Sequence, residues 1–261
     1  MPRYPNTKLG KTVLLKLHPR LRFYVPDTRN ANALQLRIML EKYGMVYIKP
    51  NRGTGGKGIV KAEMFQSGAK RIYRYKLDTS QRNFSSFDPF FHSLRRVFGK
   101  KTYLIQKGIR MLRYKGRPFD VRIMVQKNER GHWEHTGTIG RLAHPNRIVT
   151  NYHSGGTPLA LRILLSPHLR GPQRKQLENR LSLMGMVVAK HMQSGFPRIK
   201  EIGLDVGMDR HKTPWIFEVN SQPDPFIFLK LNKPSVFRRI FKLTRLHGRF
   251  RRFPLVSKKR R

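Results

Sequence analysis

Three oxygen-bearing side chains in the last quarter of the sequence are spaced to meet on one face of a β-hairpin. Asp205 lies in the run Ile-Gly-Leu-Asp-Val-Gly, and Glu218 and Asn220 lie in Trp-Ile-Phe-Glu-Val-Asn. A hairpin that turns at residues 211–212 places Asp205 directly opposite Glu218, with Cβ atoms ~5 Å apart, and puts Asn220 on the same face. Oxygen ligands of this kind suit Mg²⁺ or Mn²⁺. The alternative is that one acid pairs with a nearby arginine and no metal binds.

A glycine-rich segment, Gly53-Thr-Gly-Gly-Lys-Gly58, follows a short apolar run that ends at Lys49 and Pro50. Glycine lets backbone N–H groups approach phosphate oxygens closely, and turns of this kind form anion-binding concavities. The Lys49 ammonium is placed to contact a phosphate where the run enters the turn. The pattern predicts a phosphate-binding turn, with a plain glycine-rich hairpin and a solvated lysine as the alternative.

The same segment fits other phosphate-binding patterns, but its context argues against them. A dinucleotide-binding Gly-x-Gly-x-x-Gly turn needs a helix directly behind it, whereas Ile59-Val60-Lys61 continues as a strand. A P-loop needs Ser or Thr after Gly-Lys, and Gly58 stands there instead. A protein kinase needs an Asp with an Asn five residues further on, which is missing at Asp120, Asp205, Asp209 and Asp224.

The first half of the chain must supply the elements that hold this turn. Residues 1–26 are expected to form short strands and turns. A helix is expected from about Arg29 to Tyr43, with Asp27 or Thr28 as its N-cap and Gly44 at its end. The remaining expected elements are strands over 45–49, from 59 and over 102–106, and a helix near Phe87–Phe98.

The second half must position the acidic hairpin. The pattern predicts strands over 117–127 and 133–143, a loop over 145–160, a helix over 171–193 with Pro172 at its start, and a hairpin of residues 201–208 and 215–220. Helices and antiparallel hairpins alternate without an internal repeat. The predicted fold class is therefore α+β.

The charge of the chain narrows the class of partner. The 261 residues include 55 Lys and Arg, 14 Asp and Glu and no Cys, for a formal net charge of +41. Such a surplus attracts polyanions, so we expect an acidic polymer, an acidic protein or a nucleic acid as substrate or partner. The absence of Cys excludes disulfides, thiolate metal sites and Cys nucleophiles.

Two further features bear on location. No apolar run approaches the ~18 residues of a membrane span, and the N-terminus has no secretory signal pattern, so we expect a cytoplasmic protein without a transmembrane segment. Residues 230–261 hold 13 Lys and Arg and no acid. This basic C-terminal tail either packs a helix on the domain or lies on an acidic surface, a nucleic acid or an anionic membrane.

A set of segments occurs in an order that points to one superfamily. They are Tyr47-Ile-Lys-Pro-Asn-Arg-Gly-Thr-Gly-Gly-Lys-Gly-Ile, Leu104-Ile-Gln-Lys-Gly-Ile, Phe119-Asp-Val-Arg, Arg141, Thr150-Asn-Tyr-His-Ser-Gly-Gly, Glu201-Ile-Gly-Leu-Asp-Val-Gly and Phe217-Glu-Val-Asn-Ser-Gln-Pro. Over about residues 27–228 the chain resembles the ATP-grasp superfamily, most closely the endospore coat-associated ATP-grasp proteins of spore-forming bacteria. The spore coat is therefore a second expected location.

The resemblance implies two α+β subdomains that clasp ATP, and it implies a role for each group of matched residues. Phosphate contacts fall to Lys49 and to a flexible loop that holds Gly53, Gly55, Gly56, Lys57 and Gly58. Adenine contacts fall to Gln106, Lys107 and Ile109. Mg²⁺ or Mn²⁺ ligands would be Asp205, Glu218 and Asn220, and the transferred phosphoryl group or acyl phosphate would meet Arg122, Arg141 and Asn151.

The function implied is an ATP-dependent carboxylate–amine ligase that acts through an acyl phosphate on an acidic macromolecular substrate. A spore-coat structural or polyanion-binding protein without turnover and an ATP-grasp kinase are the alternatives. The expected domains are a truncated N-terminal segment (1–44), a lid-bearing subdomain (45–112), a metal-binding subdomain (113–229) and the basic tail (230–261). The family pattern includes a second phosphate-contacting lysine upstream of Lys49, which the sequence does not locate.

Overall fold

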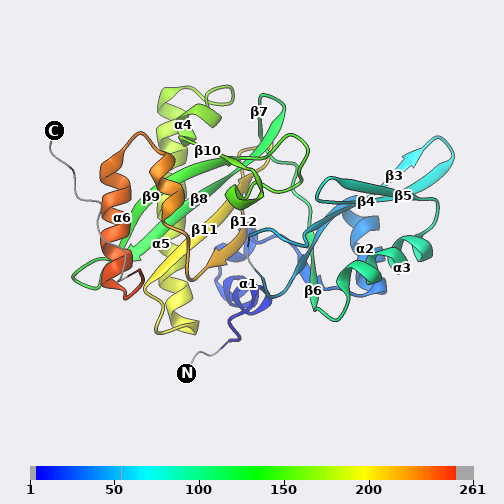
Figure 1. Cartoon of the computed structure of the whole chain (residues 1–261), viewed down its shortest axis with the longest axis horizontal. Coiled ribbons are helices and arrows are strands. Elements are labelled where there is room, and N and C mark those ends of the chain that lie inside the picture. Colours follow the sequence, from blue (N-terminus) through cyan, green and yellow to red (C-terminus); the bar gives the residue numbers. More distant parts are fainter. Residues whose placement is uncertain (1–3, 54, 251–261) are drawn as a thin grey trace.

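The computed structural model describes residues 4–53 and 55–250, which form two lobes, each built on one antiparallel sheet (Figure 1). The first sheet has the strand order β1-β6-β2-β3-β4-β5. Its strands are β1 Thr28–Asn30, β2 Met45–Pro50, β3 Val60–Ser67, β4 Lys70–Leu77, β5 Ser80–Phe84 and β6 Tyr103–Lys107. Helices α2 (Ala33–Tyr43) and α3 (Phe87–Phe98) pack on one face of this sheet through a core that includes Leu36, Phe90 and Tyr75.

The second sheet carries the acidic hairpin. Its order is β10-β9-β8-β11-β12, and β7 pairs with β8 outside this path. The strands are β7 Arg113–Tyr114, β8 Arg117–Lys127, β9 Trp133–Leu142, β10 Thr157–Leu159, β11 Glu201–Met208 and β12 Pro214–Asn220. The helices of this lobe are α1 (Lys8–Leu17), α4 (Leu161–Leu164), α5 (Gly171–Gly195) and α6 (Pro234–Leu246). The predicted α+β class is confirmed.

Side-chain alternation along β8 assigns different tasks to the two faces of the second sheet. Val121, Ile123 and Val125 are fully buried in the core that α5 and α1 complete. Asp120 and Arg122 have the opposite parity and line the space between the lobes. Further along this second face, α6 covers the end of the strand. One half of this sheet face is therefore closed by a helix, and the other half faces the first lobe.

The longest predicted helix and the hairpin are confirmed. Helix α5 begins at Gly171 with Pro172 in its first turn, and its buried residues Leu181, Val188 and Met192 follow the expected spacing. The hairpin pairs β11 with β12 and places Asp205 opposite Glu218. Gly44 ends α2 in the left-handed conformation at φ 68°, as predicted.

The prediction of strands and turns over residues 1–26 is wrong. Residues Lys8–Leu17 form α1, and Leu21–Tyr24 form a 3-10 helix. Thr7 caps α1 by accepting a hydrogen bond from the Gly10 N–H at 3.1 Å. Leu14 and Leu15 are buried against the α5 lobe, so the apolar residues of this segment follow a helical face rather than strand alternation.

The predicted start of the next helix is also wrong. Asp27 and Thr28 do not cap it, because Thr28 begins β1 and pairs with Gln106 of β6. The N-cap is Asn32, whose Oδ1 accepts a hydrogen bond from the Gln35 N–H at 2.8 Å. The predicted loop over 145–160 likewise ends in the short strand β10.

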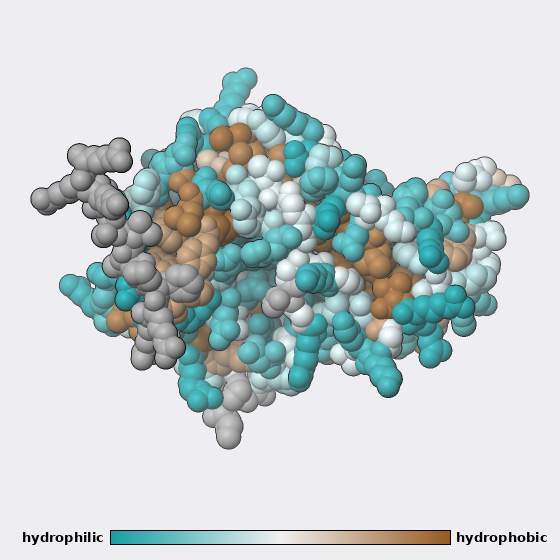
Figure 2. Space-filling model, viewed as in Figure 1, coloured by the Kyte–Doolittle hydropathy of each residue, from teal (hydrophilic) through white to brown (hydrophobic). Residues whose placement is uncertain are grey.

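The basic tail packs on the domain as far as the structure describes it. Helix α6 buries Ile240, Phe241 and Leu243, and Ile240 joins Met124 and Phe228 in a small core on the second sheet. Hydrophilic side chains cover most of one face of the molecule (Figure 2). Within residues 4–53 and 55–250, no helix has the length and apolar character needed to cross a membrane. Residues 251–261 lie outside the described part of the chain.

Candidate functional site

A pocket between the two lobes gathers the residues that the sequence singles out. It has about 1040 Å³ of empty space, a volume that includes the solvent at its open mouth. The predicted residues that line it are Lys49, Gly53, Gly55, Gly56, Lys57, Gln106, Lys107, Ile109, Arg122, Arg141, Asn151, Asp205, Glu218 and Asn220. Gly58 does not line the pocket. It lies in the turn two residues before β3, where a Cβ would meet the Tyr103 hydroxyl at 3.2 Å.

The glycine-rich loop joins β2 to β3 and reaches the other lobe. Gly53, Gly55, Gly56 and Gly58 all have φ between 72° and 134°, a backbone region that residues with a side chain rarely adopt. The Ser154 hydroxyl donates a hydrogen bond to the Gly55 carbonyl oxygen at 3.0 Å. The glycine-rich loop therefore forms one wall of the pocket and contacts the segment that holds Ser154 on the other lobe.

Lys49 is a buried lysine at the end of β2. Its ammonium donates to the Gln106 Oε1 at 3.0 Å and to the Phe217 carbonyl oxygen at 2.9 Å. Burial lowers the pKa of Lys49 to about 8, although the Glu218 carboxylate acts in the opposite direction. A lysine held in this way gains charge readily when an anion enters the pocket.

Lys8, which the sequence does not single out, connects the glycine-rich loop with the acidic hairpin. It is the first residue of α1, and its ammonium lies 2.6 Å from the Gly53 carbonyl oxygen and 3.0 Å from the Glu218 Oε1. The one signal in the sequence that could point to Lys8 is the upstream lysine that the family resemblance implies. The strands and turns expected over residues 1–26 place Lys8 on no particular face.

The acidic hairpin has the predicted register from Gly203 to Asp205, but a β-bulge between Asp205 and Val206 shifts the register by one residue on the side of the turn. Asp205 faces Glu218 across β11 and β12, and the Asn220 Nδ2 lies 3.5 Å from the Asp205 Oδ2. The two flanking glycines of β11 permit close approach, because a Cβ at Gly203 would meet Pro223 at 2.6 Å and one at Gly207 would meet the Phe217 ring at 2.2 Å. The absence of side chains at these two glycines thus lets Pro223 and Phe217 pack closely on either side of Asp205.

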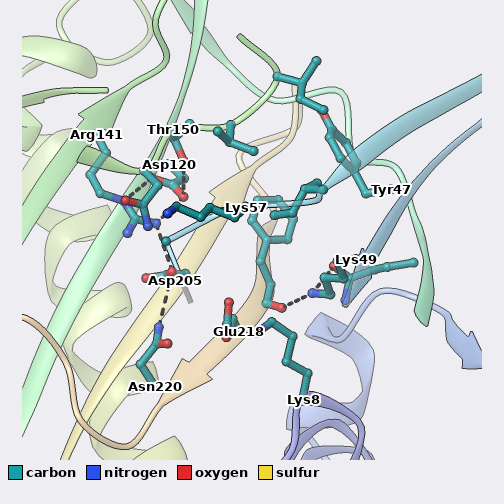
Figure 3. Close-up of a pocket in the computed structure, with 18 of the residues that line it drawn as sticks. Lys8, Tyr47, Lys49, Lys57, Asp120, Arg141, Thr150, Asp205, Glu218 and Asn220 are labelled. Atoms are coloured by element: carbon teal, nitrogen blue, oxygen red, sulfur yellow. Dashed lines mark hydrogen bonds and ion pairs between the residues drawn. The ribbon is translucent and has the colours of Figure 1, made fainter. Parts of the chain in front are cut away.

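Asp205 also belongs to a buried ionic network, so the arginine pairing that the sequence offers as an alternative is present for this acid, with two arginines rather than one. Arg122 donates to both of its carboxylate oxygens, and Arg141 Nη2 lies 3.0 Å from its Oδ2. Arg141 donates at the same time to both oxygens of Asp120, at 2.8 and 2.6 Å, and the Thr150 hydroxyl donates to Asp120 at 2.7 Å. The dashed contacts in Figure 3 follow this chain from Thr150 to Asn220.

The network fixes the charge states in this wall. Burial alone would raise the pKa of Asp205, but Arg122 and Arg141 outweigh it and hold the pKa at about 2. Burial acts to lower the pKa of Arg141, and the Asp120 and Asp205 carboxylates more than reverse that effect. Asp205 and Arg141 are therefore both ionised at neutral pH.

The donor chemistry fits Mg²⁺ or Mn²⁺. Asp205, Glu218 and Asn220 offer carboxylate and amide oxygens on one side of the pocket. Glu218 is the freer carboxylate, because its side chain is 27% exposed and pairs with Lys8, whereas that of Asp205 is 11% exposed and pairs with two arginines. Among the described residues no three His, Cys, Asp or Glu side chains form a metal-binding group, so phosphate oxygens would have to complete the coordination.

The other end of the pocket suits a flat, weakly polar group. Gln106, Lys107 and Ile109 come from the end of β6 and the segment behind it, and Met111, Tyr47 and Phe217 complete this end. Burial raises the pKa of Tyr47 to about 12, so its hydroxyl stays protonated. These apolar and amide groups lie beside the Lys49 ammonium, which contacts Gln106 and the Phe217 carbonyl, and a pocket that combines them suits a nucleotide with its flat base and charged phosphates.

Two solved structures share the fold of this chain over most of its length. The ATP-grasp ligase PsnB complexed with precursor peptide PsnA2 and AMPPNP matches with a TM-score of 0.50 and 14% identity, over 93% of this chain and 59% of that chain. D-cycloserine synthetase DcsG matches with a TM-score of 0.52 and 11% identity, over 89% and 67%. At these identities the likeness shows the fold alone, and that fold is the ATP-grasp fold.

Sequence comparison places the chain more narrowly. The model of the YheC/D-like ATP-grasp family matches residues 3–249, and the chain belongs to this family. The endospore coat-associated proteins YheD and YheC of Bacillus subtilis (strain 168) are 31% and 24% identical over 219 and 233 residues. These regions cover 82% and 85% of this chain, but 48% and 64% of the relatives. The chain thus spans less than two thirds of either relative.

Proposed function

We propose that the protein is an ATP-dependent carboxylate–amine ligase that works through an acyl phosphate. The observation that supports this most directly is the convergence of Lys49, the glycine-rich loop and the Asp205–Glu218 pair on one pocket between two lobes. An ATP-grasp fold with an intact set of cationic and acidic side chains is suited to align a triphosphate with a second substrate.

The pocket suggests how ATP would bind. The adenine would lie against Gln106, Lys107 and Ile109, and the phosphates would meet Lys49, Lys57 and the N–H groups of the glycine-rich loop. Lys8 is placed to supply the upstream lysine that the family pattern includes, because it lies at the Gly53 carbonyl and at Glu218. Asp205, Glu218 and Asn220 would hold Mg²⁺, which neutralises phosphate charge when it is bound.

The second substrate would react at the arginine-lined end of the pocket. A substrate carboxylate oxygen attacks the γ-phosphorus, ADP leaves, and an amine then displaces phosphate from the acyl carbon. Arg122 and Arg141 are positioned to stabilise the negative charge that develops in both steps, and Asn151 lies on the same wall. Lys57 extends from the glycine-rich loop toward this network (Figure 3).

The charge and the relatives support a choice of substrate and location. A net charge of +41 favours an acidic, macromolecular carboxylate substrate. The two curated relatives are endospore coat-associated, so a protein that modifies or joins the spore coat, after synthesis in the cytoplasm, is part of the proposal. A coat protein that keeps the fold without turnover, and a kinase on the same pocket, are the rival functions.

Product analysis separates these functions. The purified protein is incubated with ATP, Mg²⁺, acidic peptides and a panel of amines, and ADP and orthophosphate are measured together with the peptide mass. A ligase gives equal amounts of ADP and orthophosphate and a peptide joined to the amine. A kinase gives ADP and a phosphorylated product, and an inactive coat protein gives neither. Glu218→Gln is the matched control, and we expect it to lose the ligase products.

A further inference from the structure

One face of the first sheet continues beyond the nucleotide pocket without a covering helix. Directly opposed residues share a face of a sheet, and the register places Tyr47 opposite Lys61, Lys61 opposite Lys76, and Lys76 opposite Gln81. Tyr47 lines the pocket. This row, which we name the lysine row, therefore runs from the pocket across four strands to the edge strand β5.

Strand alternation shows that the lysine row lies on the uncovered side. Val60, Ala62 and Tyr75 are the chain neighbours of Lys61 and Lys76, and they belong to the core that α2 and α3 cover. Neighbours along a strand point to opposite faces, so Lys61 and Lys76 point away from both helices. Both lysines are half-buried rather than fully solvated.

The charges on this face are not balanced. Lys61 stands directly opposite Lys76, and like charges in this position destabilise a sheet. The nearest carboxylate, Glu63, is shared by the Lys61 ammonium at 2.7 Å and the Arg74 guanidinium at 3.1 Å. Within the described part of the chain, Lys76 makes no ion pair. The face has a local surplus of positive charge that an anionic partner would relieve.

The far end of the same face adds an apolar contact. On the same face, Phe65 stands opposite Ile72, beyond the pair of Glu63 and Arg74. Phe65 is 37% exposed, and the Arg74 guanidinium carbon lies 4.6 Å from the centre of its ring. A face that combines lysines, a stacked arginine and an exposed ring suits a polypeptide, which offers carboxylates and apolar side chains in one strand.

We propose that the lysine row is a docking surface for an acidic segment of the polypeptide substrate. The proposal rests on the ligase function proposed above, because a carboxylate-activating site needs its carboxylate delivered to the pocket. A polypeptide is favoured over a nucleic acid because it carries the reacting group itself. The continuity of the row with Tyr47 would hold the segment beside the pocket.

The test uses a fluorescein-labelled polyglutamate peptide and the full chain. Its binding is measured by fluorescence anisotropy for the unmodified protein, for Lys61→Gln/Lys76→Gln, and for the control Lys175→Gln/Lys190→Gln. The control removes the same charge from exposed positions of α5, on the other lobe. We expect the first pair to weaken binding about fivefold and the control pair less than about twofold. Added salt should reduce the difference.

Other results would overturn the proposal. Equal losses in both variants would mean that binding follows net charge alone, and no loss in either would mean that the row is not used. Stronger competition by an oligonucleotide of equal charge would assign the surface to nucleic acid. The thermal shift caused by ATP and Mg²⁺ is measured in each variant. A retained shift shows that the nucleotide pocket is intact. The docking proposal can therefore fail while the ligase proposal stands, and the ligase proposal can fail while the peptide still binds to the lysine row.

Discussion

Two clusters of buried polar side chains lie on the same face of the second sheet and differ in what completes them. The pocket cluster consists of Asp120, Arg122, Arg141, Thr150 and Asp205. The helix cluster consists of Gln126, Glu201, Thr244, His247 and Arg249. The first faces the space between the lobes, whereas the second lies beneath α6.

The helix cluster takes its hydrogen-bond partners from the chain itself, except at the buried His247 Nδ1, which has none among the described residues and lies 3.6 Å from the Glu201 Oε2. Gln126 Nε2 lies 3.0 Å from both the Glu201 Oε2 and the Thr244 Oγ1, and Arg249 pairs with the other Glu201 oxygen. The His247 Nε2 lies 2.8 Å from the Lys127 carbonyl oxygen. Buried polar groups with so many partners fix one arrangement of the elements that carry them, so this cluster fastens α6 to the sheet.

The pocket cluster balances its own charges but leaves an open side. Its two carboxylates and two guanidiniums cancel in sum, so any stabilisation of a phosphoryl group by Arg122 and Arg141 depends on their fixed orientation and not on a net charge of this wall. The cations available to a phosphate come from the opposite side, at Lys8, Lys49 and Lys57. Similar buried networks therefore have different roles in the two places. The helix cluster fixes α6 on the sheet, and the pocket cluster holds charged groups in fixed positions at the edge of the pocket.

The largest expected effect comes from the pocket cluster. Asp205→Asn keeps the shape of the side chain but removes its negative charge. The Asp205 carboxyl group has a pKa of about 2 and is therefore ionised at neutral pH. We expect ligase turnover to fall about 10³-fold. The Mg²⁺-dependent part of the nucleotide thermal shift should also disappear. Turnover and melting curves are measured with and without Mg²⁺. An unchanged metal dependence would contradict the assignment of Asp205.

The matched change in the helix cluster should act on stability alone. Glu201→Ala leaves Arg249 and Gln126 without their buried partner, and we expect the free energy of unfolding to fall by about 3 kcal/mol. Nucleotide affinity at a temperature where the variant is folded should stay within about twofold. Urea unfolding measures the expected loss of stability, and nucleotide titration measures the expected retention of affinity. A loss of nucleotide affinity without a loss of stability would break the distinction between the clusters.

The contrast also shows which parts of the site the sequence could predict. The pairing of Asp205 with Glu218 is local, because both residues belong to one hairpin, although the β-bulge beside Asp205 is a feature that the sequence does not predict. The strand, glycine-rich turn and strand around Lys49 are local in the same way. These features rest on alternation and turn chemistry, and the structure places them as predicted.

The pocket cluster could not be assembled from the sequence because its two ion pairs meet only through the pairing of β8 with β11. Asp120 and Arg141 are opposed within the β8–β9 hairpin and are 21 residues apart, but Arg122 and Asp205 are 83 residues apart and come from strands that are not consecutive. The position of Lys8 in the site could not be predicted for another reason. A short segment with several leucines fits helix and strand alike until a neighbouring helix selects one face.

A smaller effect is expected where one member of the pocket cluster supports another. Asp120→Asn removes a carboxylate that holds Arg141 through two hydrogen bonds. We expect kcat to fall about tenfold while the KM for ATP changes by less than about twofold, because Arg141 loses its orientation rather than its charge. Thr150→Val, which removes the 2.7 Å donor to Asp120, should shift kcat in the same direction by less. A rise in KM alone would place Asp120 in ATP binding instead.

The smallest expected effect concerns the opposite wall and its pH dependence. The folded pKa of Lys49 is about 8, below the ordinary value of 10.5. The unfolded chain therefore binds more protons between these values, and this group makes the free protein more stable as pH rises through that window. Nucleotide affinity should change in the opposite sense, because a phosphate requires the charged ammonium. Above about pH 8, affinity should fall by at most tenfold per pH unit.

Nucleotide titrations at several pH values from about 7.5 to 9.5 test this, since the phosphate itself titrates near pH ~6 and stays fully charged throughout. Lys49→Met should bind more weakly and show a flat profile, because no titrating group remains at that position. The pocket cluster supplies the internal comparison. Asp205, with a pKa of about 2, and Arg141, with a raised pKa, do not titrate in this window. A pH dependence that survives Lys49→Met would therefore have to come from another group, and the division of the pocket into a titrating cationic wall and a fixed ionic wall would fail.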